Sequence, residues 1–419
     1  MLVYVLNKNG EPLMPCSPRK ARLLLKERKA FVKKKEPFTI QLKYSSTGYR
    51  QNINLGVDAG SEHIGLSATT EKKVLFESDI QLRNDITKLL EDRRSFRRSR
   101  RNRKTRYRKA RFLNRVKLKH KGWLAPSVEQ KINCHINSIQ KVCRLLPINK
   151  IIVETAQFDI QKLQNSNIQG KEYQRGKLYG FANAREYVLN RDNYTCQHCK
   201  GKSKDSHLQV HHIIFRRNGG SDDIDNLITL CKTCHDKLHK GNFEITKLGK
   251  AKQGLKHSAF MNIMRKTLLI RLKNIFQNVE ETFGYITKEL RFENNLTKEH
   301  YIDARCISGN PKAETDGTVY FQKKIRCHNR KLHKANILKG NKKKNNQAPF
   351  EILGFRLFDK VKYLGKQYFI FGRRNSGFFD IRNIDFSEKI GSIKYNLLKL
   401  IERKENYLIE RRSLISIQH

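Results

Sequence analysis

The sequence has few acidic residues, little proline and no long apolar run. Asp and Glu number 39 against 87 Lys and Arg, so the 419-residue chain has a formal net charge of +48. No run approaches the ~18 apolar residues that cross a bilayer, and the N-terminus lacks the basic region and cleavage site of a signal peptide. With 8 Pro and 38% hydrophobic residues, the chain is not broadly disordered. We expect two to four domains and a polyanionic partner, nucleic acid first and an acidic membrane surface second.

Basic residues concentrate in residues 93–119, which hold 15 Lys or Arg in 27 positions and no acid. A helix of this composition repels itself in isolation, so we expect it to be ordered by a bound polyanion. A solvated surface helix or a localisation tag is the alternative, but 15 cations without one acid exceed what solubility requires. The candidate nucleic-acid contacts are Arg93, Arg94, Arg97, Arg98, Arg100, Arg101, Arg103, Arg106, Arg108 and Arg111. Residues 323–344 form a second basic stretch, expected to be loop.

Several segments have the periodicity of regular elements. We expect a small N-terminal α+β module with a strand at 3–6, a loop at 11–15, a helix at 19–28 capped by Ser17, and strands at 29–34 and 38–43. Further along we expect a three-stranded meander in 52–79, a helix at 127–146, a short strand at 149–154, helical structure across 258–290, a helix at 296–308 capped by Thr297, and a small antiparallel sheet or barrel in 354–383.

Nine cysteines are too few for a disulfide scaffold of this length, but four of them form two Cys-x-x-Cys pairs. The pairs Cys196/Cys199 and Cys231/Cys234 are separated by 31 residues. A two-residue gap lets both sulfurs of a pair reach one ion, so four thiolates can form a closed tetrahedral zinc site. Four reduced core cysteines would be the alternative, but chance rarely produces two such pairs in one Lys- and His-rich segment. We expect a reducing compartment and a structural Zn²⁺.

Histidines and one asparagine lie in and after the segment between these pairs: His211, His212, Asn226, His235 and His239. Their order inside a zinc clasp resembles the HNH, or ββα-metal, nucleases over about residues 182–242. Phosphodiester hydrolysis needs an activated water and a Lewis acid for the developing charge. The resemblance implies that one histidine of the adjacent pair holds Mg²⁺ and the other deprotonates the water.

Strand geometry lets the adjacent histidines take different roles, because neighbouring residues face opposite sides. We assign His212 as the general base and His211 as a metal ligand. His235 and His239 are spaced i, i+4 and share one helix face toward the ion. The resemblance favours His235 over His239 as a ligand, because zinc-clasped members of the family vary at the position of His239. Asn226 either coordinates the ion or orients the base.

Three acidic residues lie at positions that suit metal binding, although a single acid after a strand is usually part of a turn or a cap. Asp58 and Glu154 end expected strands, and Asp303 lies one helical turn after His300. Residues 54–65, 151–154 and 300–303 resemble the first, second and third motifs of RuvC nucleases of the RNase H fold. The resemblance implies a pair of Mg²⁺ ions held by Asp58, Glu154 and Asp303, with His300 acting as an acid/base or orienting the substrate.

Taken together, these motifs resemble the IscB family of transposon-associated, RNA-guided DNA endonucleases. The implied fold is α/β: a split RNase H-like RuvC domain, an inserted HNH domain clasped by zinc, an N-terminal PLMP module, and a small C-terminal antiparallel β domain. The implied boundaries are a PLMP module at 1–50, RuvC-like segments at 51–82, 121–181 and 243–308, an arginine-rich bridge helix at 83–120, an HNH domain at 182–242, and a guide-RNA and target-adjacent-motif region at 309–419.

The resemblance also implies partners and a division of labour. A structured guide noncoding RNA would direct one protein copy to double-stranded DNA beside a short flanking motif. The HNH domain would cut the guide-paired strand and the RuvC-like domain the displaced strand. The expected location is the prokaryotic cytoplasm, at the nucleoid and not at a membrane. Two alternatives remain: an HNH or resolvase-type endonuclease that reads DNA itself, and a catalytically silent RNA- or DNA-binding protein.

Overall fold

The chain forms two compact units in the computed structural model. The first combines Met1–Ala156 with Met264–His419, and the second is Gln157–Ile263. The structure describes residues 2–46, 48–86, 89–95, 123–124, 126–155, 178, 181, 183–215, 218, 220, 222–245, 256–326, 334–335, 343–344 and 349–413. In this part of the chain, no helix combines the length and apolar content that a membrane span needs.

The N-terminal module is a four-stranded sheet of order β2-β1-β4-β3 with one helix. Its elements are β1 (Val3–Leu6), β2 (Pro12–Cys16), α1 (Pro18–Lys26), β3 (Ala30–Lys34) and β4 (Thr39–Leu42). The Ser17 cap is confirmed, because its side chain accepts a hydrogen bond from the Lys20 amide. The loop expected at 11–15 is wrong: β2 pairs antiparallel with β1. It is an edge strand, where proline is tolerated since one side needs no ladder hydrogen bond.

A seven-stranded mixed sheet forms the centre of the first unit, in the order β11-β8-β5-β6-β7-β12-β22. Its strands are β5 (Asn54–Ala59), β6 (His63–Thr69), β7 (Val74–Gln81), β8 (Lys150–Glu154), β11 (Val279–Thr282), β12 (Thr318–Lys324) and β22 (Tyr407–Ser413). The expected meander is confirmed, because β5, β6 and β7 are consecutive antiparallel neighbours. β8 joins β5 in parallel, so their carboxyl ends meet at one edge.

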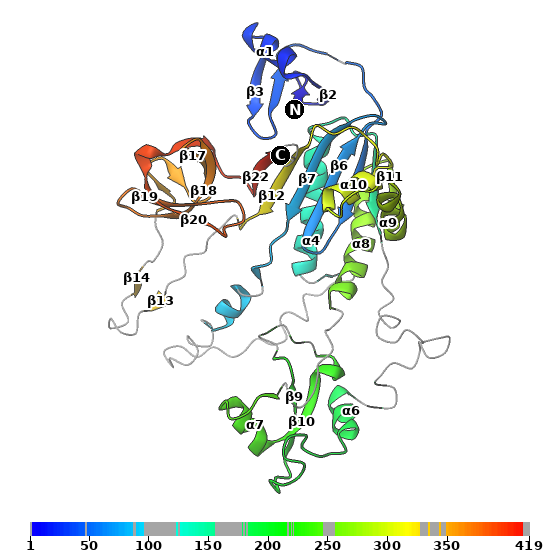
Figure 1. Ribbon diagram of the computed structural model, residues 1–419, viewed down its shortest axis with the longest axis vertical. Helices are drawn as coiled ribbons and strands as arrows, with labels where there is room; N and C mark the ends of the chain where they lie inside the picture. The colour runs from blue at the N-terminus through cyan, green and yellow to red at the C-terminus, as the bar shows by residue number, and fades with distance from the viewer. Residues whose placement is uncertain are drawn as a thin grey trace. The chain divides into compact units, whose positions relative to one another are not determined.

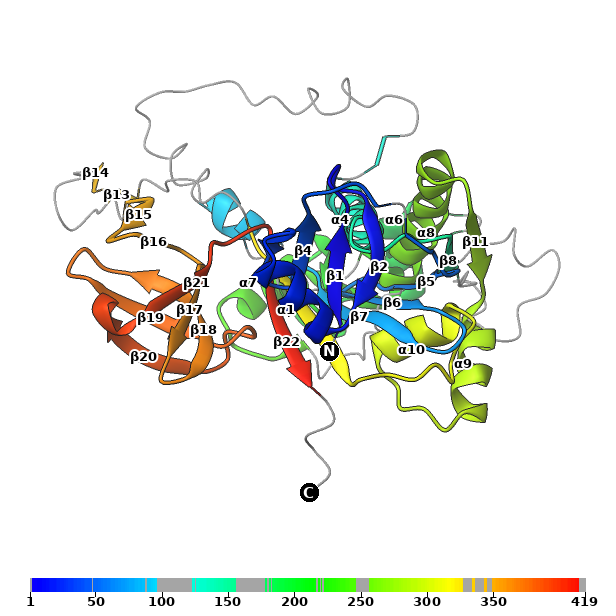
Figure 2. The same cartoon turned by 90° about the horizontal axis from the view of Figure 1, so that it is seen from above.

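Helices cover the two faces of this sheet (Figures 1 and 2). They are α4 (Pro126–Cys143), α8 (Lys256–Ile275), α9 (Gly284–Glu293) and α10 (His300–Ile307). The apolar face predicted for α4 is buried. The helix expected at 296–308 starts late: Glu299, not Thr297, precedes its first turn. The helical expectation for 258–290 misses β11, which sheet pairing with β8 stabilises.

The antiparallel sheet predicted for 354–383 is present but extends further, because two of its five strands lie beyond residue 383. The C-terminal segment also contributes β12 and β22 to the central sheet. The five strands are β17 (Lys360–Tyr363), β18 (Lys366–Arg373), β19 (Phe378–Arg382), β20 (Lys389–Lys394) and β21 (Lys399–Glu402). Shorter strands are β13 (Lys334–Ala335), β14 (Lys343–Lys344), β15 (Glu351–Ile352) and β16 (Phe355–Arg356). Phe379, Val361 and Ile370 lie in the hydrophobic core of the five-stranded sheet.

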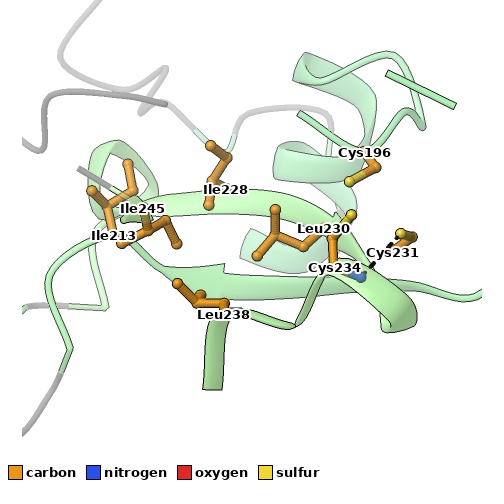
Figure 3. Close-up of a cluster of buried hydrophobic side chains, with 8 residues drawn as sticks. All are labelled: Cys196, Ile213, Ile228, Leu230, Cys231, Cys234, Leu238 and Ile245. Carbon is orange, nitrogen blue, oxygen red and sulfur yellow. Dashed lines mark hydrogen bonds between the residues drawn. The ribbon is translucent and has the colours of Figure 1, made fainter. Parts of the chain in front are cut away.

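The second unit contains a ββα arrangement: β9 (Leu208–His212), β10 (Leu227–Cys231) and α7 (Lys232–His239), preceded by α6 (Ala184–Arg191). A short 3-10 turn, Ile224–Asn226, leads into β10. Its core packs Ile213, Ile228, Leu230, Leu238 and Ile245 beside the buried cysteines (Figure 3).

Candidate functional site

The four paired cysteines converge, as the sequence predicted. Their sulfurs all lie within 4.8 Å of one another, and the Cys199 and Cys231 sulfurs are 3.9 Å apart. Tetrahedral zinc with bonds of about 2.3 Å separates its sulfur ligands by about 3.8 Å, so the donor set and spacing fit Zn²⁺. Cys231 also caps α7, because its sulfur accepts from the Cys234 amide (Figure 3). A bound zinc ion would therefore fix the start of the helix that carries His235 and His239.

Three histidines from β9 and α7 form a second cluster. The Nε2 atoms of His211 and His239 are 3.3 Å apart, as are those of His239 and His235. The Nδ1 of His211 lies 2.8 Å from the His212 carbonyl, to which it donates, so its Nε2 lone pair faces the other two rings. Burial lowers the pKa of His211, which favours the neutral imidazole that a metal requires.

The donor set of this cluster decides which cations suit it. Three imidazole nitrogens fit a divalent transition metal, whereas Mg²⁺ prefers oxygen ligands. His235 and His239 contribute equally to the cluster, so the preference for His235 over His239 has no counterpart in the geometry. We therefore retain His211, His235 and His239 as metal-binding candidates, with a cation chemistry different from the expected Mg²⁺.

His212 lies on the opposite side of β9 from His211 and has a separate partner. Its Nε2 is 2.8 Å from the Asp222 Oδ1. When Nε2 carries the proton and donates to this carboxylate, Nδ1 has the lone pair that a general base needs. Asp222 was not a predicted site residue. The only sequence signal was an acid in the polar loop before Asn226.

Asn226 acts on the backbone that follows His212. It is 1% exposed, its Nδ2 donates to the Ile214 carbonyl at 3.0 Å, and its Oδ1 accepts from the Ile214 amide at 2.8 Å. Since these two bonds engage both ends of the amide, the geometry favours the orienting alternative over metal coordination. Gly220 permits this contact, because a Cβ there would lie 1.8 Å from the Ile214 carbonyl.

The carboxylates Asp58, Glu154 and Asp303, hereafter the carboxylate site, come from three distant segments. Asp58 and Glu154 lie at the carboxyl ends of the parallel strands β5 and β8, one residue beyond the paired Val57 and Val153. Asp303 is on α10, which packs on β5 and β6. The sheet edge and one helix thus bring the three acids into one region.

Two glycines let α10 approach the sheet closely. A Cβ at Gly65, the strand partner of Asp58, would lie 1.9 Å from the His300 carbonyl oxygen. A Cβ at Gly56 would lie 1.9 Å from the Ala304 carbonyl oxygen. Because backbone atoms of a helix cannot give way cheaply, only glycine fits at these positions.

Each carboxylate has its own partner inside the fold. The Asp58 Oδ2 is 2.6 Å from His300 Nδ1, the Glu154 Oε1 is 3.3 Å from Arg265 Nη2, and the Asp303 Oδ1 is 3.1 Å from Arg291 Nε. Sequence reasoning missed Arg265 and Arg291. In a chain with 87 Lys and Arg, no signal marks two arginines as special.

Asp58 influences the pKa values of the other two carboxylates. Burial raises the pKa values of Glu154 and Asp303, Asp58 raises each further, and Arg265 and Arg291 oppose the rise. Among the described residues, however, metal-ligand atoms converge within 4.8 Å only at the four cysteines and the three histidines. The carboxylate oxygens suit Mg²⁺ chemically, but in this structure they lie further apart than a compact ligand set.

His300 is held on two sides. The hydrogen bond to Asp58 raises its pKa despite partial burial, and its ring stacks on His63 with centroids 5.1 Å apart and planes 8° apart. The His63 Nδ1 lies 3.0 Å from Asp79 on β7. This arrangement fixes the plane of the His300 ring next to the carboxylate site.

Most predicted nucleic-acid contacts fall outside the described residues, namely Arg97, Arg98, Arg100, Arg101, Arg103, Arg106, Arg108 and Arg111. Arg93 and Arg94 are described: they lie in the helical residues 89–95 and are exposed. That exposure is compatible with phosphate contact.

Two family models match separate parts of the chain. Residues 3–176 match the family described as RRXRR protein, and residues 196–241 match the HNH endonuclease family. Anaredoxin of Nostoc sp. is 40% identical over 67 residues, which are 16% of this chain and 86% of that protein. The Type IV methyl-directed restriction enzyme EcoKMcrA of Escherichia coli is 35% identical over 60 residues, 13% of this chain and 21% of that enzyme.

Among solved structures, Streptococcus thermophilus Cas9 in complex with the AGAA PAM is similar at a TM-score of 0.35 and 12% identity, over 59% of this chain and 32% of that one. The chain thus spans about a third of that Cas9 and about a fifth of the restriction enzyme. The order of an RRXRR region followed by an HNH endonuclease domain, with the motifs described above, makes this chain a member of the IscB-like nucleases.

Proposed function

We propose that this protein is an RNA-guided endonuclease that cuts both strands of DNA at two separate centres. The observation that carries the proposal is the presence of two nuclease-type constellations in two compact units of one chain with a charge of +48. One enzyme with two centres can cleave the two strands of a duplex without forming a dimer. Since DNA is the substrate, we place the protein at the prokaryotic nucleoid in the cytoplasm.

In the HNH unit, His212 would accept the proton of the attacking water at Nδ1, with Asp222 stabilising the imidazolium through Nε2. Asn226 would hold the backbone beyond His212 in place. A divalent cation on His211, His235 and His239 would stabilise charge on the scissile phosphate. We assign the guide-paired strand to this centre.

In the first unit, Asp58, Glu154 and Asp303 would bind Mg²⁺ in the manner of a RuvC nuclease, and this centre would cut the displaced strand. The donors are oxygen atoms, as Mg²⁺ requires. Arg265 and Arg291 neutralise two of the acids in the structure described here. Released from Glu154 and Asp303, they would be available to contact the phosphates of the substrate.

The resemblance and the basic composition of the chain support guidance by RNA. The stretch 93–119 would follow the phosphates of the guide and heteroduplex. The C-terminal sheet would contact the RNA and the flanking DNA motif, since it pairs cations with exposed aromatic rings: Arg382 lies 4.1 Å from the Phe371 centroid and Arg356 lies 5.0 Å from that of Phe350. Such pairs suit stacking on unpaired bases.

The test is strand-resolved cleavage by His212→Ala and Asp58→Ala variants of the RNA-loaded protein. We expect His212→Ala to cut only the displaced strand and Asp58→Ala only the guide-paired strand, each losing the other cut by a factor of about 10²–10⁴. His207→Ala and Asp85→Ala, which change exposed residues, are the matched controls. If either single variant still cuts both strands, the division of labour is wrong.

A second candidate is an endonuclease that reads DNA itself, which the EcoKMcrA match favours. That match covers 60 residues, so it supports the cutting chemistry and not the targeting. Sequencing of copurified nucleic acid and assay after its removal separate the two candidates. Stoichiometric RNA and loss of cutting without it support guidance, whereas full activity of RNA-free protein contradicts it.

A further inference from the structure

A cavity of about 250 Å³ lies in the first unit, where the N-terminal module, α4 and the central sheet meet. Single waters need only ~10–15 Å³ of such volume, so this cavity can hold a much larger group. Its apolar wall includes Leu6, Phe76, Ile80, Val142 and Ile409. Phe76 is itself stacked on Tyr320, with ring centroids 5.4 Å apart, and this contact orients the Phe76 ring.

Four cations share the cavity with that wall: Lys33, Lys34, Lys141 and Arg144. The acid that lines it is Glu405, whose Oε2 is 3.8 Å from the Lys34 Nζ. One carboxylate leaves a surplus of positive charge in a partly enclosed space. An anion would relieve this repulsion.

Among the described cations of this cavity, Lys141 most clearly lacks a compensating acceptor. Its Nζ is buried and, among the described residues, has no hydrogen-bond acceptor. The Nζ lies 4.1 Å from the Tyr407 ring centroid, a cation–π contact that does not replace an acceptor. Burial and the nearby Lys34 lower the pKa of Lys141 to about 8. A buried ammonium without an acceptor is costly, so an anionic oxygen is the group that this site lacks.

We propose that this cavity binds one unstacked nucleotide of the guide RNA, with the base on the apolar wall and its phosphate on Lys141 and the neighbouring cations. An apolar wall beside clustered cations fits a ligand with a flat apolar part and an anionic part. RNA is favoured over duplex DNA because unpaired loop nucleotides present their bases without the cost of melting a helix. The statement that the ligand belongs to the guide RNA rests on the proposed function. The statement that the cavity suits a nucleotide rests on its lining residues alone.

Acetylation footprinting of the full-length protein tests the proposal. The modification rate of Lys141 is measured by mass spectrometry in RNA-free protein, in the complex with its copurifying RNA, and with a mixture of the four ribonucleoside 5′-monophosphates. We expect the RNA and the nucleotides each to slow Lys141 acetylation at least ~10-fold, as a charge-assisted hydrogen bond would. Lys72, an exposed lysine of the β6–β7 turn, is the internal control for free nucleotides and should not change.

Other ligands give different outcomes. Protection by inorganic phosphate to the same extent as by nucleotides, or by a fatty acid and not by nucleotides, would overturn the proposal. Protection by a single-stranded DNA but not by RNA of the same sequence would overturn the assignment to the guide. Unchanged Lys141 reactivity in an RNA complex that still cuts DNA would refute this inference alone and leave the proposed function standing.

A variant provides the second measurement. Lys141→Met keeps the aliphatic stem and removes the charge, and Lys72→Met is its matched control. With RNA carrying 4-thiouridine, we expect crosslinks to peptides of α4 to fall ~10-fold in Lys141→Met and to persist in Lys72→Met. Thermal melting of both variants checks the fold, and undiminished crosslinks in a folded Lys141→Met variant would contradict the proposal.

Discussion

The two candidate centres differ in how the chain builds them. The HNH site comes from one short segment: β9 and β10 pair in register and α7 follows directly, so local structure places the cysteines and the histidines. The carboxylate site depends on contacts between distant segments, as in the bond between His300 and Asp58, which are 242 residues apart. A local site can be recognised by spacing, whereas a site assembled at long range depends on the whole sheet.

The centres should also depend on different sources of stability. The core beside the cysteines is small, and small domains commonly need a metal to fold. The central sheet has its own extensive buried core, with fully buried Leu55, Ile64 and Leu66. Four experiments test this contrast.

The largest effect should come from loss of zinc. Removal of the ion by a chelator, or Cys196→Ser, is expected to unfold the HNH unit, since structural zinc supplies roughly 10–16 kcal/mol of folding free energy. Hydrogen exchange should rise in β9 and β10 and stay slow in β5 and β6. Cys16→Ser, which alters an unpaired cysteine of the N-terminal module, is the control. Retained protection in β9 after chelation would show that the cysteines are not a structural zinc site.

A buried histidine should make the first unit sensitive to acid. His135 on α4 is fully buried, and burial lowers its pKa to about 4. The folded pKa lies below the unfolded value of about 6.5. The contribution of neutral His135 to the free energy of unfolding is therefore complete above pH ~6.5. It is lost as the pH falls toward 4, because the unfolded state takes up the proton first.

The loss should amount to roughly 3 kcal/mol in the free energy of unfolding between pH 7 and pH 4. Urea unfolding followed by exchange in β5 and β6 measures it. His135→Leu should flatten the pH dependence, and His207→Leu, at an exposed position of the other unit, should not. An unchanged slope in His135→Leu would assign the acid sensitivity to other groups.

Gly65→Ala tests whether long-range packing is what builds the carboxylate site. The added methyl group would meet the His300 carbonyl at 1.9 Å and displace α10. Misplacement by about 1 Å costs ~100-fold in rate, so displaced-strand cutting should fall by that factor while guide-paired cutting persists.

Gly10→Ala is the control for this substitution, because its Cβ meets nothing closer than Gln41 Nε2 at 3.9 Å. Its left-handed backbone costs ~1–2 kcal/mol of stability without touching either centre. Strand-labelled assays that show equal cutting of both strands by Gly65→Ala would contradict the packing argument.

The smallest effect is expected from Asp222→Asn in the HNH unit. The substitution keeps a hydrogen-bonding group near His212 Nε2 but removes the charge that stabilises the imidazolium. Guide-paired cutting should slow ~10-fold, a loss of about 1.4 kcal/mol, and displaced-strand cutting should not change. Glu244→Gln, at an exposed position of the same unit, controls for charge. Equal rates of guide-paired cutting for Asp222→Asn and wild type would show that Asp222 has no role in this centre.

The sequence was informative where chemistry demands fixed spacing. Two Cys-x-x-Cys pairs and an i, i+4 histidine pair predicted the cysteine and histidine clusters, since local geometry fixes the distances. It was less informative where a polar side chain binds the backbone. The sequence allowed Asn226 either to coordinate the ion or to orient the base, and only the structure shows its amide hydrogen-bonded to Ile214. Proline in residues 11–15 suggested a loop, because sequence does not show that β2 is a sheet edge.

The residue types and their spacing define the kinds of chemistry available: thiolates for zinc, imidazoles for a cation and a base, carboxylates at strand ends, and a large excess of positive charge. The neighbours of those groups are set only when the chain folds. Arg265 and Arg291 pair with Glu154 and Asp303, and Asp222 with His212, because sheet order and helix packing set distances between segments that no local pattern encodes. The physical reason is that spacing along the chain fixes geometry over only a turn or two, while long-range contacts depend on the packing of the whole unit.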